Sequence, residues 1–211
     1  MKTATLIRAL AADAARPVIA IERSIQTALI AGAAGSLALF ILLLRPRADF
    51  ADALHGFELP MKLTFVVCLA FTAARALVGV ARPTTRRLRS RALGIAPLVL
   101  LLAVLVELLT APSSTWLARL GGRNVAHCLA LIPMLSVLPG AFLFIALKRG
   151  APAQPGLAGA IAGLTASALG ACLYALSCPE DSPLFVATWY SLAIGAVTAV
   201  SCLAGRRWLR W

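Results

Sequence analysis

Acidic side chains are scarce in this sequence, and so is charge in general. There are 8 Asp and Glu against 20 Lys and Arg, and charged residues make up only 13% of the chain. Soluble globular proteins carry about 25% charged residues. This composition therefore excludes an ordinary water-soluble domain.

Several motifs that would indicate an enzyme are also missing. The sequence contains no CxxC dithiol of the kind used by membrane oxidoreductases, no phosphate-binding loop, and no nucleophile with a base at a useful spacing. We therefore expect a protein that is not an enzyme and that has no permanently bound cofactor.

Long apolar runs take the place of these motifs. Hydrophobic residues make up 61% of the chain and the mean hydropathy is +0.89. A membrane-spanning helix needs about 20 mainly apolar residues. Six segments qualify, at 24–44, 60–80, 92–110, 126–147, 156–177 and 184–204. The sequence thus predicts an all-α, polytopic membrane protein with six transmembrane helices.

The basic residues predict how these helices are oriented. Fourteen of the 20 Lys and Arg fall on one side of the expected membrane, in the amino-terminal segment, the loop at 81–91, the turn at 148–149 and the carboxyl-terminal tail. Because positive residues stay in the cytoplasm, we expect both termini to be cytoplasmic in a bacterial inner membrane. The net charge of +12 then reflects topology and contact with lipid, and direct binding to nucleic acid is not expected.

The chain divides into residues 1–23, a cytoplasmic amino-terminal segment, and residues 24–211, the six-helix transmembrane domain. The first segment predicts a short amphipathic helix, with Leu6, Ile7 and Leu10 along one apolar edge and Asp13 away from it. Such a helix could lie on the inner leaflet, or it could dock into a groove on a cytosolic protein.

Small residues and prolines predict how the helices pack. Gly159, Gly163 and Ser167 recur at four-residue spacing, as do Gly32 and Ser36, and this pattern allows helix backbones to approach closely in lipid. Pro133 and Pro139 should bend the fourth helix, because each proline removes a backbone donor and crowds the preceding turn.

Two of the five cysteines are candidates for a site. Cys68, Cys172 and Cys202 lie within helices, where a packing role is the default. The expected topology brings Cys128 and Cys178 to the same outer face. A disulfide would require their Cα atoms to lie about 4.4–6.8 Å apart, which the sequence alone does not determine.

Polar neighbours of this cysteine pair suggest a metal site as a second possibility. His127, Glu180 and Asp181 stand beside the two thiols in the sequence, and this donor set suits a soft or borderline divalent ion. The spacing matches no zinc pattern. Another interpretation is that Asp181 or Ser182 caps the sixth helix, with Pro183 at its first position.

The sequence also allows predictions for a few charged and aromatic residues near the membrane boundary. Lys62 and Glu107 should both lie near the outer boundary and could pair, whereas Arg75 lies toward the inner side, where its side chain can reach the interface. Trp189 and Tyr190 fall where an interfacial aromatic belt would place them.

Four stretches resemble the six-helix bacterial membrane proteins known as negative regulators of sigma F. They are "LIRALAADAARPV", "RNVAHCLALIP", "LKRGAPAQPGLAGAIAGLTASALGACLYAL" and "CPEDSPLFVATWYS". The last two are specific, and the resemblance covers essentially the whole chain, although the first three helices match only in character.

The resemblance implies an anti-sigma factor. Such a protein would hold an extracytoplasmic-function sigma factor at the inner membrane and release it under heavy-metal or oxidative stress, sensed through the pair that matches Cys128 and Cys178. It also favours a sigma-binding role for the amino-terminal helix, through Leu6, Ile7, Leu10 and Asp13. A heavy-metal ion bound transiently at the cysteine pair would be the only ligand.

Two other functions remain open at this point. The protein could be a small metal-ion transporter or efflux accessory protein that uses the same cysteines as an entry site, or a structural partner in a larger membrane complex. Besides lipid and a sigma factor, further copies of the chain are possible partners.

Overall fold

The structure is a computed structural model that describes residues 3, 21–81, 90–150 and 152–210. All regular secondary structure in these ranges is helical. In chain order the elements are α2 (Ile21–Leu43), α3 (Phe50–Ala53), α4 (Glu58–Ala81), the 3-10 helix η1 (Ser90–Gly94), α5 (Ile95–Thr110), the 3-10 helix η2 (Ser113–Thr115), α6 (Trp116–Gly121), α7 (Val125–Lys148), α8 (Pro155–Ala175), α9 (Pro183–Phe185), the π-helical turn η3 (Val186–Tyr190) and α10 (Ser191–Trp208).

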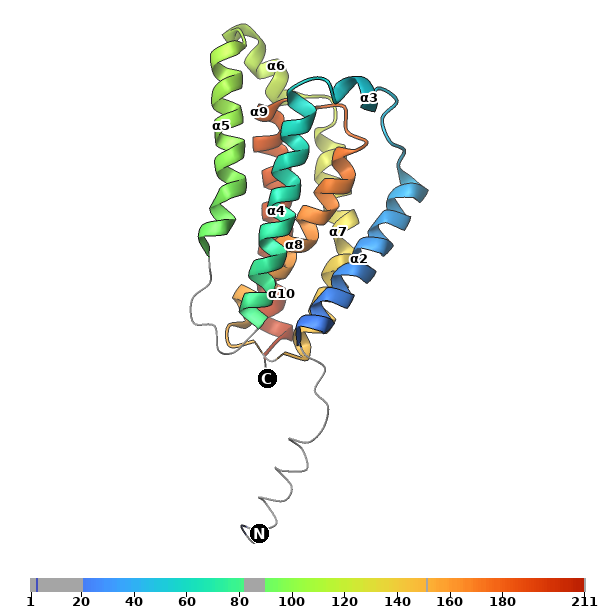
Figure 1. The fold of residues 1–211 in the computed structure, drawn as a ribbon, viewed down its shortest axis with the longest axis vertical. Helices are drawn as coiled ribbons and strands as arrows, with labels where there is room; N and C mark the ends of the chain where they lie inside the picture. Colours follow the sequence, from blue (N-terminus) through green and yellow to red (C-terminus); the bar gives the residue numbers. More distant parts are fainter. Residues whose placement is uncertain (1–2, 4–20, 82–89, 151, 211) are drawn as a thin grey trace.

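Six of the helices described are long and apolar enough to cross a membrane. They span Ile21–Leu43, Glu58–Ala81, Ala92–Thr110, Val125–Lys148, Pro155–Ala175 and Pro183–Trp208. These bounds confirm the six expected segments to within a few residues. Figure 1 shows the start of α2 and the end of α10 at one end of the bundle, with α3 and α6 at the other, which we call the α3/α6 end.

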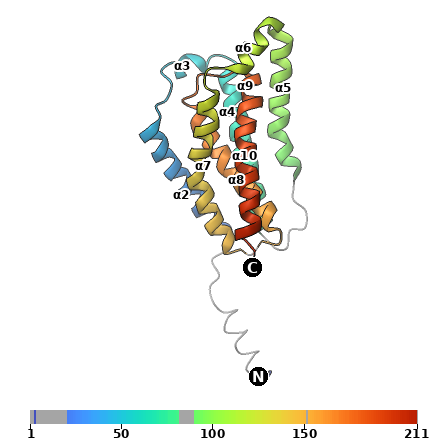
Figure 2. The same cartoon turned by 180° about the vertical axis from the view of Figure 1, so that it is seen from behind.

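Helix α8 forms the centre of the bundle. It runs between α2 and α5, which lie at opposite edges in Figure 1, and α7 and α10 cover it on the side seen in Figure 2. Its glycines make this possible: a Cβ at Gly159 would stand 2.4 Å from the Ser201 carbonyl oxygen, and one at Gly163 2.4 Å from Ser201 Cβ. The small-residue pattern in this helix is therefore a packing surface, as the sequence predicts.

The second small-residue pair packs against a proline of α7. A Cβ at Gly32 would stand 2.5 Å from Pro139 Cα, so only glycine allows α2 to lie this close. Proline has no N–H and leaves the carbonyl four residues earlier without its helical donor. Ser36 Oγ donates a hydrogen bond of 2.6 Å to that carbonyl, Leu135 O. A hydroxyl from α2 thus satisfies a backbone group that Pro139 would otherwise leave unpaired in lipid.

The sixth span is longer than expected and is not a regular α-helix throughout. It begins at Pro183 and ends at Trp208, and a π-helical turn occupies Val186–Tyr190. Single π turns inside helices occur mostly where a local constraint repositions side chains, often at functional sites. Here the turn lies at the α3/α6 end, next to the loop between α8 and α9.

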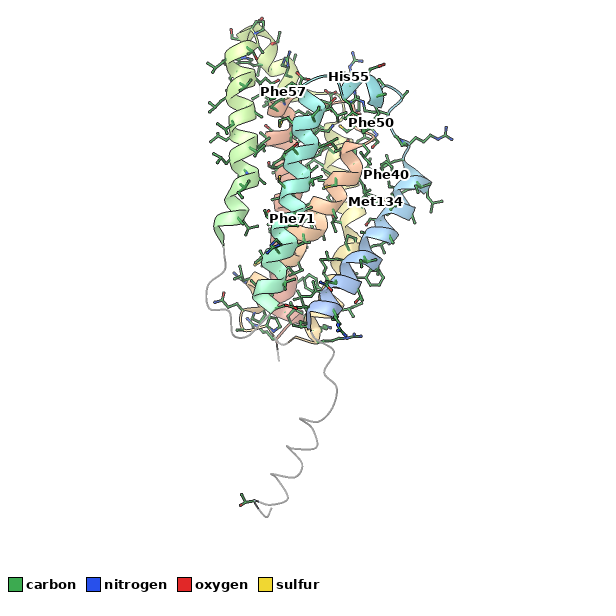
Figure 3. The ribbon with its side chains drawn as sticks, viewed as in Figure 1. Phe40, Phe50, His55, Phe57, Phe71 and Met134 are labelled. Carbon is green, nitrogen blue, oxygen red and sulfur yellow. The ribbon has the colours of Figure 1, made fainter. Side chains whose placement is uncertain are left out.

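The outer surface of the bundle is apolar. Large hydrophobic side chains on it are well exposed, among them Phe71 (61%) and Leu109 (86%), and Figure 3 shows Phe71 on α4. Phe40, by contrast, is buried in the core. An apolar surface of this kind suits a lipid environment and agrees with the six spans.

The contact between α2 and α7 gives a stability prediction. Replacing Ser36 with Ala leaves the Leu135 carbonyl without a donor, and hydrogen bonds between helices in membranes contribute about 0.6 to 1.7 kcal/mol. We expect a lower melting temperature in detergent, followed by tryptophan fluorescence. Ser167→Ala is the matched control, because the Ser167 hydroxyl bonds only within its own helix, to Leu164 O. Equal losses in the two variants would contradict this role of Ser36.

Candidate functional site

The loop at residues 176–182, which we call the α8–α9 loop, is the polar centre of the α3/α6 end. It leaves α8 through a tight turn in which the Cys178 N–H donates to Tyr174 O at 3.0 Å. The segment that follows α2 joins it there, since the Arg47 N–H donates to Leu176 O at 3.1 Å. The loop is therefore bound to the end of α2 as well as to α8 and α9.

Lys62 of α4 holds the loop from inside the bundle. Its side chain is fully buried, and its ammonium group donates to Cys178 O at 2.9 Å, Glu180 O at 3.1 Å and Asp181 Oδ1 at 2.7 Å. All three N–H groups of the ammonium are thus satisfied, and its charge is paired. The suggested pairing of Lys62 with Glu107 is wrong, because the loop supplies every acceptor that Lys62 uses.

Arg47 extends this ion pair toward the surface. Its guanidinium binds Asp181 Oδ2 and, at 2.7 Å, Asp49 Oδ2. The hydrogen bond with Asp49, together with that to Asp181, raises the pKa of Arg47 above its ordinary value, although burial opposes this. The same Arg47 hydrogen bond lowers the pKa of Asp49 from 3.8 to about 2. Because the pKa of Asp49 is lower in the folded state, its ion pair with Arg47 contributes to folding stability above pH 3.8. This contribution is lost as the pH falls through about 2.

Glu107 of α5 binds the start of the sixth span. Its carboxylate accepts from Ser182 Oγ at 2.6 Å and from the Leu184 N–H at 2.8 Å. Ser182 occupies the N-cap position and Pro183 the first helical position, as expected, but the Ser182 side chain makes no capping bond. The expected cap by Ser182 or Asp181 is therefore wrong: a carboxylate from another helix satisfies the free N–H, where the helix dipole also favours a negative charge.

Arg119 connects Glu107 to the surface. Its guanidinium lies 3.0 Å from Glu107 Oε1 and 3.2 Å from Glu58 Oε1. The hydrogen bond with Glu107 is the largest cause of a raised Arg119 pKa. Since Glu58 begins α4 and Arg119 lies in α6, these contacts join α4, α5 and α6.

Two further contacts bind the segment before α7 to the same region. Glu180 Oε1 accepts from the Arg123 N–H at 3.0 Å, and Trp189 Nε1 donates to Leu120 O at 2.8 Å. The α8–α9 loop and the helix after it therefore contact α4 and α5 directly, and the connections that follow α2 and α6. A displacement of this loop would therefore disturb the contacts of most of the spans at the α3/α6 end.

The two candidate cysteines are buried at this end of the bundle, Cys178 in the loop itself and Cys128 near the start of α7. Cys128 is fully buried near the start of α7, Cys178 is 2% exposed, and both belong to one hydrophobic cluster. All five cysteines of the chain are free thiols. Both thiols therefore lie in the interior of the bundle and not on its surface.

The predicted third ligand lies elsewhere. His127 is exposed, whereas its neighbour Cys128 faces the core. Successive helical residues are rotated by about 100°, so the two side chains cannot both point inward. Within the described ranges, no three or more His, Cys, Asp and Glu side chains form a group that could hold a metal ion. Asp181 and Glu180 instead serve the contacts described above.

Tyr190 occupies a position that the sequence did not indicate. It is fully buried, so its expected place in an interfacial aromatic belt is wrong. Its ring packs against Tyr174, with 5.7 Å between ring centroids, and the Lys62 ammonium lies 5.8 Å from its centroid. The same ammonium donates to Cys178 O at 2.9 Å, so Tyr190 and Cys178 adjoin the same charge. The Tyr190 hydroxyl has no hydrogen-bond partner among the described residues.

The other predicted residues fall outside this cluster. Leu6, Ile7, Leu10 and Asp13, and most of the basic loop at 81–91, lie outside the described residues. Arg75 is exposed on α4, with its guanidinium 5.6 Å from the ring of Phe71. This agrees with a side chain that reaches toward the interface along the apolar surface.

Comparisons with known proteins identify the family. Residues 10–211 match the model of a family described as "Negative regulator of sigma F". The chain belongs to this family. It is 36% identical over 216 residues to a "Probable anti-sigma-F factor NrsF" of Azospira oryzae, and 34% identical over 215 residues to the "Anti-sigma-F factor NrsF" of Caulobacter vibrioides. Each alignment covers 100% of both chains, whereas no solved structure matches.

Membership in the negative regulators of sigma F agrees with the resemblance noted in the sequence. The names of the relatives support an anti-sigma role and a sigma factor as partner, and they point to a regulatory protein and not to an enzyme. The six apolar helices are compatible with a multi-pass membrane protein of this family.

The buried ion pair gives a prediction about assembly of the site. Lys62→Met removes three hydrogen bonds and one charge of a buried pair, a change that typically costs about 3–5 kcal/mol. We expect a much lower melting temperature and less monodisperse protein in detergent. Adding Asp181→Asn should recover part of the loss, because the two residues are directly coupled.

The control for this prediction is Arg75→Met. Arg75 is also a charged residue of α4, but it is exposed and forms no such pair, so its loss should change the melting temperature little. If Lys62→Met melted within a degree or so of the control, the proposed importance of the buried pair would be refuted.

Proposed function

We propose that this protein is an inner-membrane anti-sigma factor that responds to stress through Cys128 and Cys178. In its resting state it holds an extracytoplasmic-function sigma factor at the cytoplasmic face. A heavy-metal ion or an oxidant that modifies the two thiols, at the outer end of the bundle, makes it release that sigma factor. The family supports the anti-sigma role, and the sensing chemistry is our proposal.

One observation supports the sensing proposal: the two thiols belong to one buried cluster at the loop to which several other spans are bound. Cys178 is part of the α8–α9 loop, and its carbonyl accepts from the buried Lys62 ammonium. Cys128 enters the same cluster from α7. A bond between the two sulfurs, or a metal ion shared by them, would therefore act at once on α7, on the loop and on Lys62 of α4.

Two chemistries suit this pair. A soft divalent ion would replace both thiol protons and be held by the two sulfurs. Alternatively, an oxidant that accepts two electrons would join the sulfurs as a disulfide, with release of two protons. Both change the packing of a buried cluster, where small shifts are poorly tolerated because protein interiors are close-packed.

The response requires a change in the balance between two states. Moving an equilibrium from 99:1 to 1:99 takes about 5.5 kcal/mol of differential affinity. Binding of a metal by two thiolates, or a new covalent bond, is of sufficient strength. In our proposal the shift of α7 relative to α8 and α10 extends to their far ends, where it weakens the surface that holds the sigma factor.

The amino-terminal segment is our candidate for that surface. Its apolar edge of Leu6, Ile7 and Leu10, with Asp13 on the polar side, has the spacing with which a helix binds a groove. The segment directly precedes α2, which packs on α7 through Gly32 and Ser36. A movement of α7 would therefore reach α2 and the segment joined to it.

The cysteine proposal predicts a specific loss of response. In cells that carry a reporter for the sigma factor, Cys128→Ser and Cys178→Ser should each keep the reporter repressed and prevent its induction by Cd²⁺. Cys202→Ser is the control, because Cys202 lies in α10 outside the buried cluster, and it should respond as the native protein does. Normal induction in both site variants would refute sensing by this pair.

The docking proposal predicts a different loss. Deletion of residues 1–16 should leave the membrane domain intact, raise reporter activity without any metal, and abolish co-purification of the sigma factor. The triple variant Leu6→Ala, Ile7→Ala, Leu10→Ala should do the same, whereas Thr3→Ala should not. Metal transport by reconstituted vesicles, together with unchanged transcription in the deletion variant, would instead favour the transporter alternative.

A further inference from the structure

The hydroxyl of Tyr190 is an unexplained polar group in the interior of the protein. The residue is fully buried, and within the described part of the chain its oxygen has no hydrogen-bond partner. Buried polar groups are nearly always paired, so each exception calls for a physical reason. A phenylalanine would fill the same space without leaving a polar group unsatisfied.

The groups around this hydroxyl suggest why a tyrosine and not a phenylalanine occupies the position. Tyr190 shares a buried cluster with Cys128 and Cys178. The Lys62 ammonium, which lies 5.8 Å from the Tyr190 ring centroid, also donates to the Cys178 carbonyl at 2.9 Å. The Cys178 thiol itself makes only a long contact of 3.9 Å, to Glu180 O. A hydroxyl without an acceptor and a sulfur without a strong partner therefore belong to the same buried cluster.

The charged groups nearby are already committed to one another. The Lys62 ammonium uses its three N–H groups on the carbonyls of Cys178 and Glu180 and on Asp181. Arg47 is bound to Asp181 and Asp49. Neither cation is free to donate to a sulfur, whereas the Tyr190 hydroxyl is.

The position of Tyr190 is set by the π-helical turn. It is the last residue of Val186–Tyr190, and its ring is held between Tyr174 at 5.7 Å, Phe185 at 6.4 Å and the Lys62 ammonium at 5.8 Å. Next to it, Trp189 fixes the turn to the segment before α7 through its bond to Leu120 O. The hydroxyl is thus held in place by its neighbours and not by a bond of its own.

From this arrangement we propose that Tyr190 is a positioning residue of the cysteine site, whose hydroxyl donates a hydrogen bond to a thiolate sulfur once a soft divalent metal ion is bound there. The inference rests on the proposed function in taking Cys128 and Cys178 as the metal-binding pair. A metal-bound thiolate is a good acceptor, and partners that hydrogen-bond to ligands typically change metal affinity about 10- to 100-fold.

The hydroxyl would then distinguish the two states of the protein. It is unpaired when the thiols are free and paired when the metal is bound, so it favours the bound state over the resting state. Because Tyr190 also belongs to the π-helical turn, the new bond links the occupied site directly to the sixth span.

The test measures binding of Cd²⁺ alone to the full chain in detergent. Cys68, Cys172 and Cys202 are replaced by alanine, so that absorbance from sulfur-to-metal charge transfer reports only the candidate pair. We expect Tyr190→Phe to weaken Cd²⁺ binding at least about tenfold. The melting temperature of the metal-free protein should stay the same or rise, because the substitution removes an unpaired buried hydroxyl.

The matched control is Thr188→Val. It removes a hydroxyl from the same π-helical turn, but that hydroxyl bonds only within its own helix, to Leu184 O. Cd²⁺ affinity should therefore be retained. If Tyr190→Phe bound as tightly as the native chain, if both variants weakened equally, or if the native pair bound no Cd²⁺, the inference would be overturned.

Failure of this inference and failure of the proposed function give different results. Cd²⁺ binding that depends on Tyr190, without release of a sigma factor in cells, would support the inference and refute the sensing function. Release of a sigma factor that depends on both cysteines, with Cd²⁺ affinity unchanged by Tyr190→Phe, would refute the inference alone.

Discussion

A buried lysine is the constraint on which the polar end of this protein depends. An ammonium group inside a membrane domain is costly unless every N–H group has an acceptor and the charge has a partner. Lys62 meets both conditions through a single loop, using two carbonyls and one carboxylate from residues 178–181. The loop is thereby drawn into the bundle, and the thiol of Cys178 is buried with it.

The remaining contacts of the α3/α6 end follow from this arrangement. Asp181 lies between Lys62 and Arg47, so the connection after α2 is bound to the same carboxylate. Glu107 satisfies the start of the sixth span just beyond the loop. A chemical change at Cys178 would therefore act at the junction of several helices and would alter how they pack.

Much of the fold could be predicted because it depends on local composition. The six spans follow from apolar length, and the close contact of α8 with α10 follows from glycines at 159 and 163. The number of spans also puts the start of α7, with Cys128, and the end of α8, followed by Cys178, at the same end of the bundle. The partners of the charged residues could not be predicted in this way. Lys62 and Glu107 were recognised as needing partners. Lys62 found its partners in the α8–α9 loop, and Glu107 found its partners in Ser182, the Leu184 N–H and Arg119. No local pattern specifies these pairings.

The sequence alone thus determined the class, the number of spans, the family and the two thiols of interest. Only the tertiary structure decided that His127 faces away from Cys128, that Glu107 caps the sixth span, and that the Tyr190 hydroxyl lies unpaired in the buried cluster that holds both thiols. The physical reason is one of range. Hydrophobicity and small-residue spacing act along one helix and can be read from neighbouring residues. The hydrogen bonds and ion pairs at the α3/α6 end instead join residues about 60 to 130 positions apart.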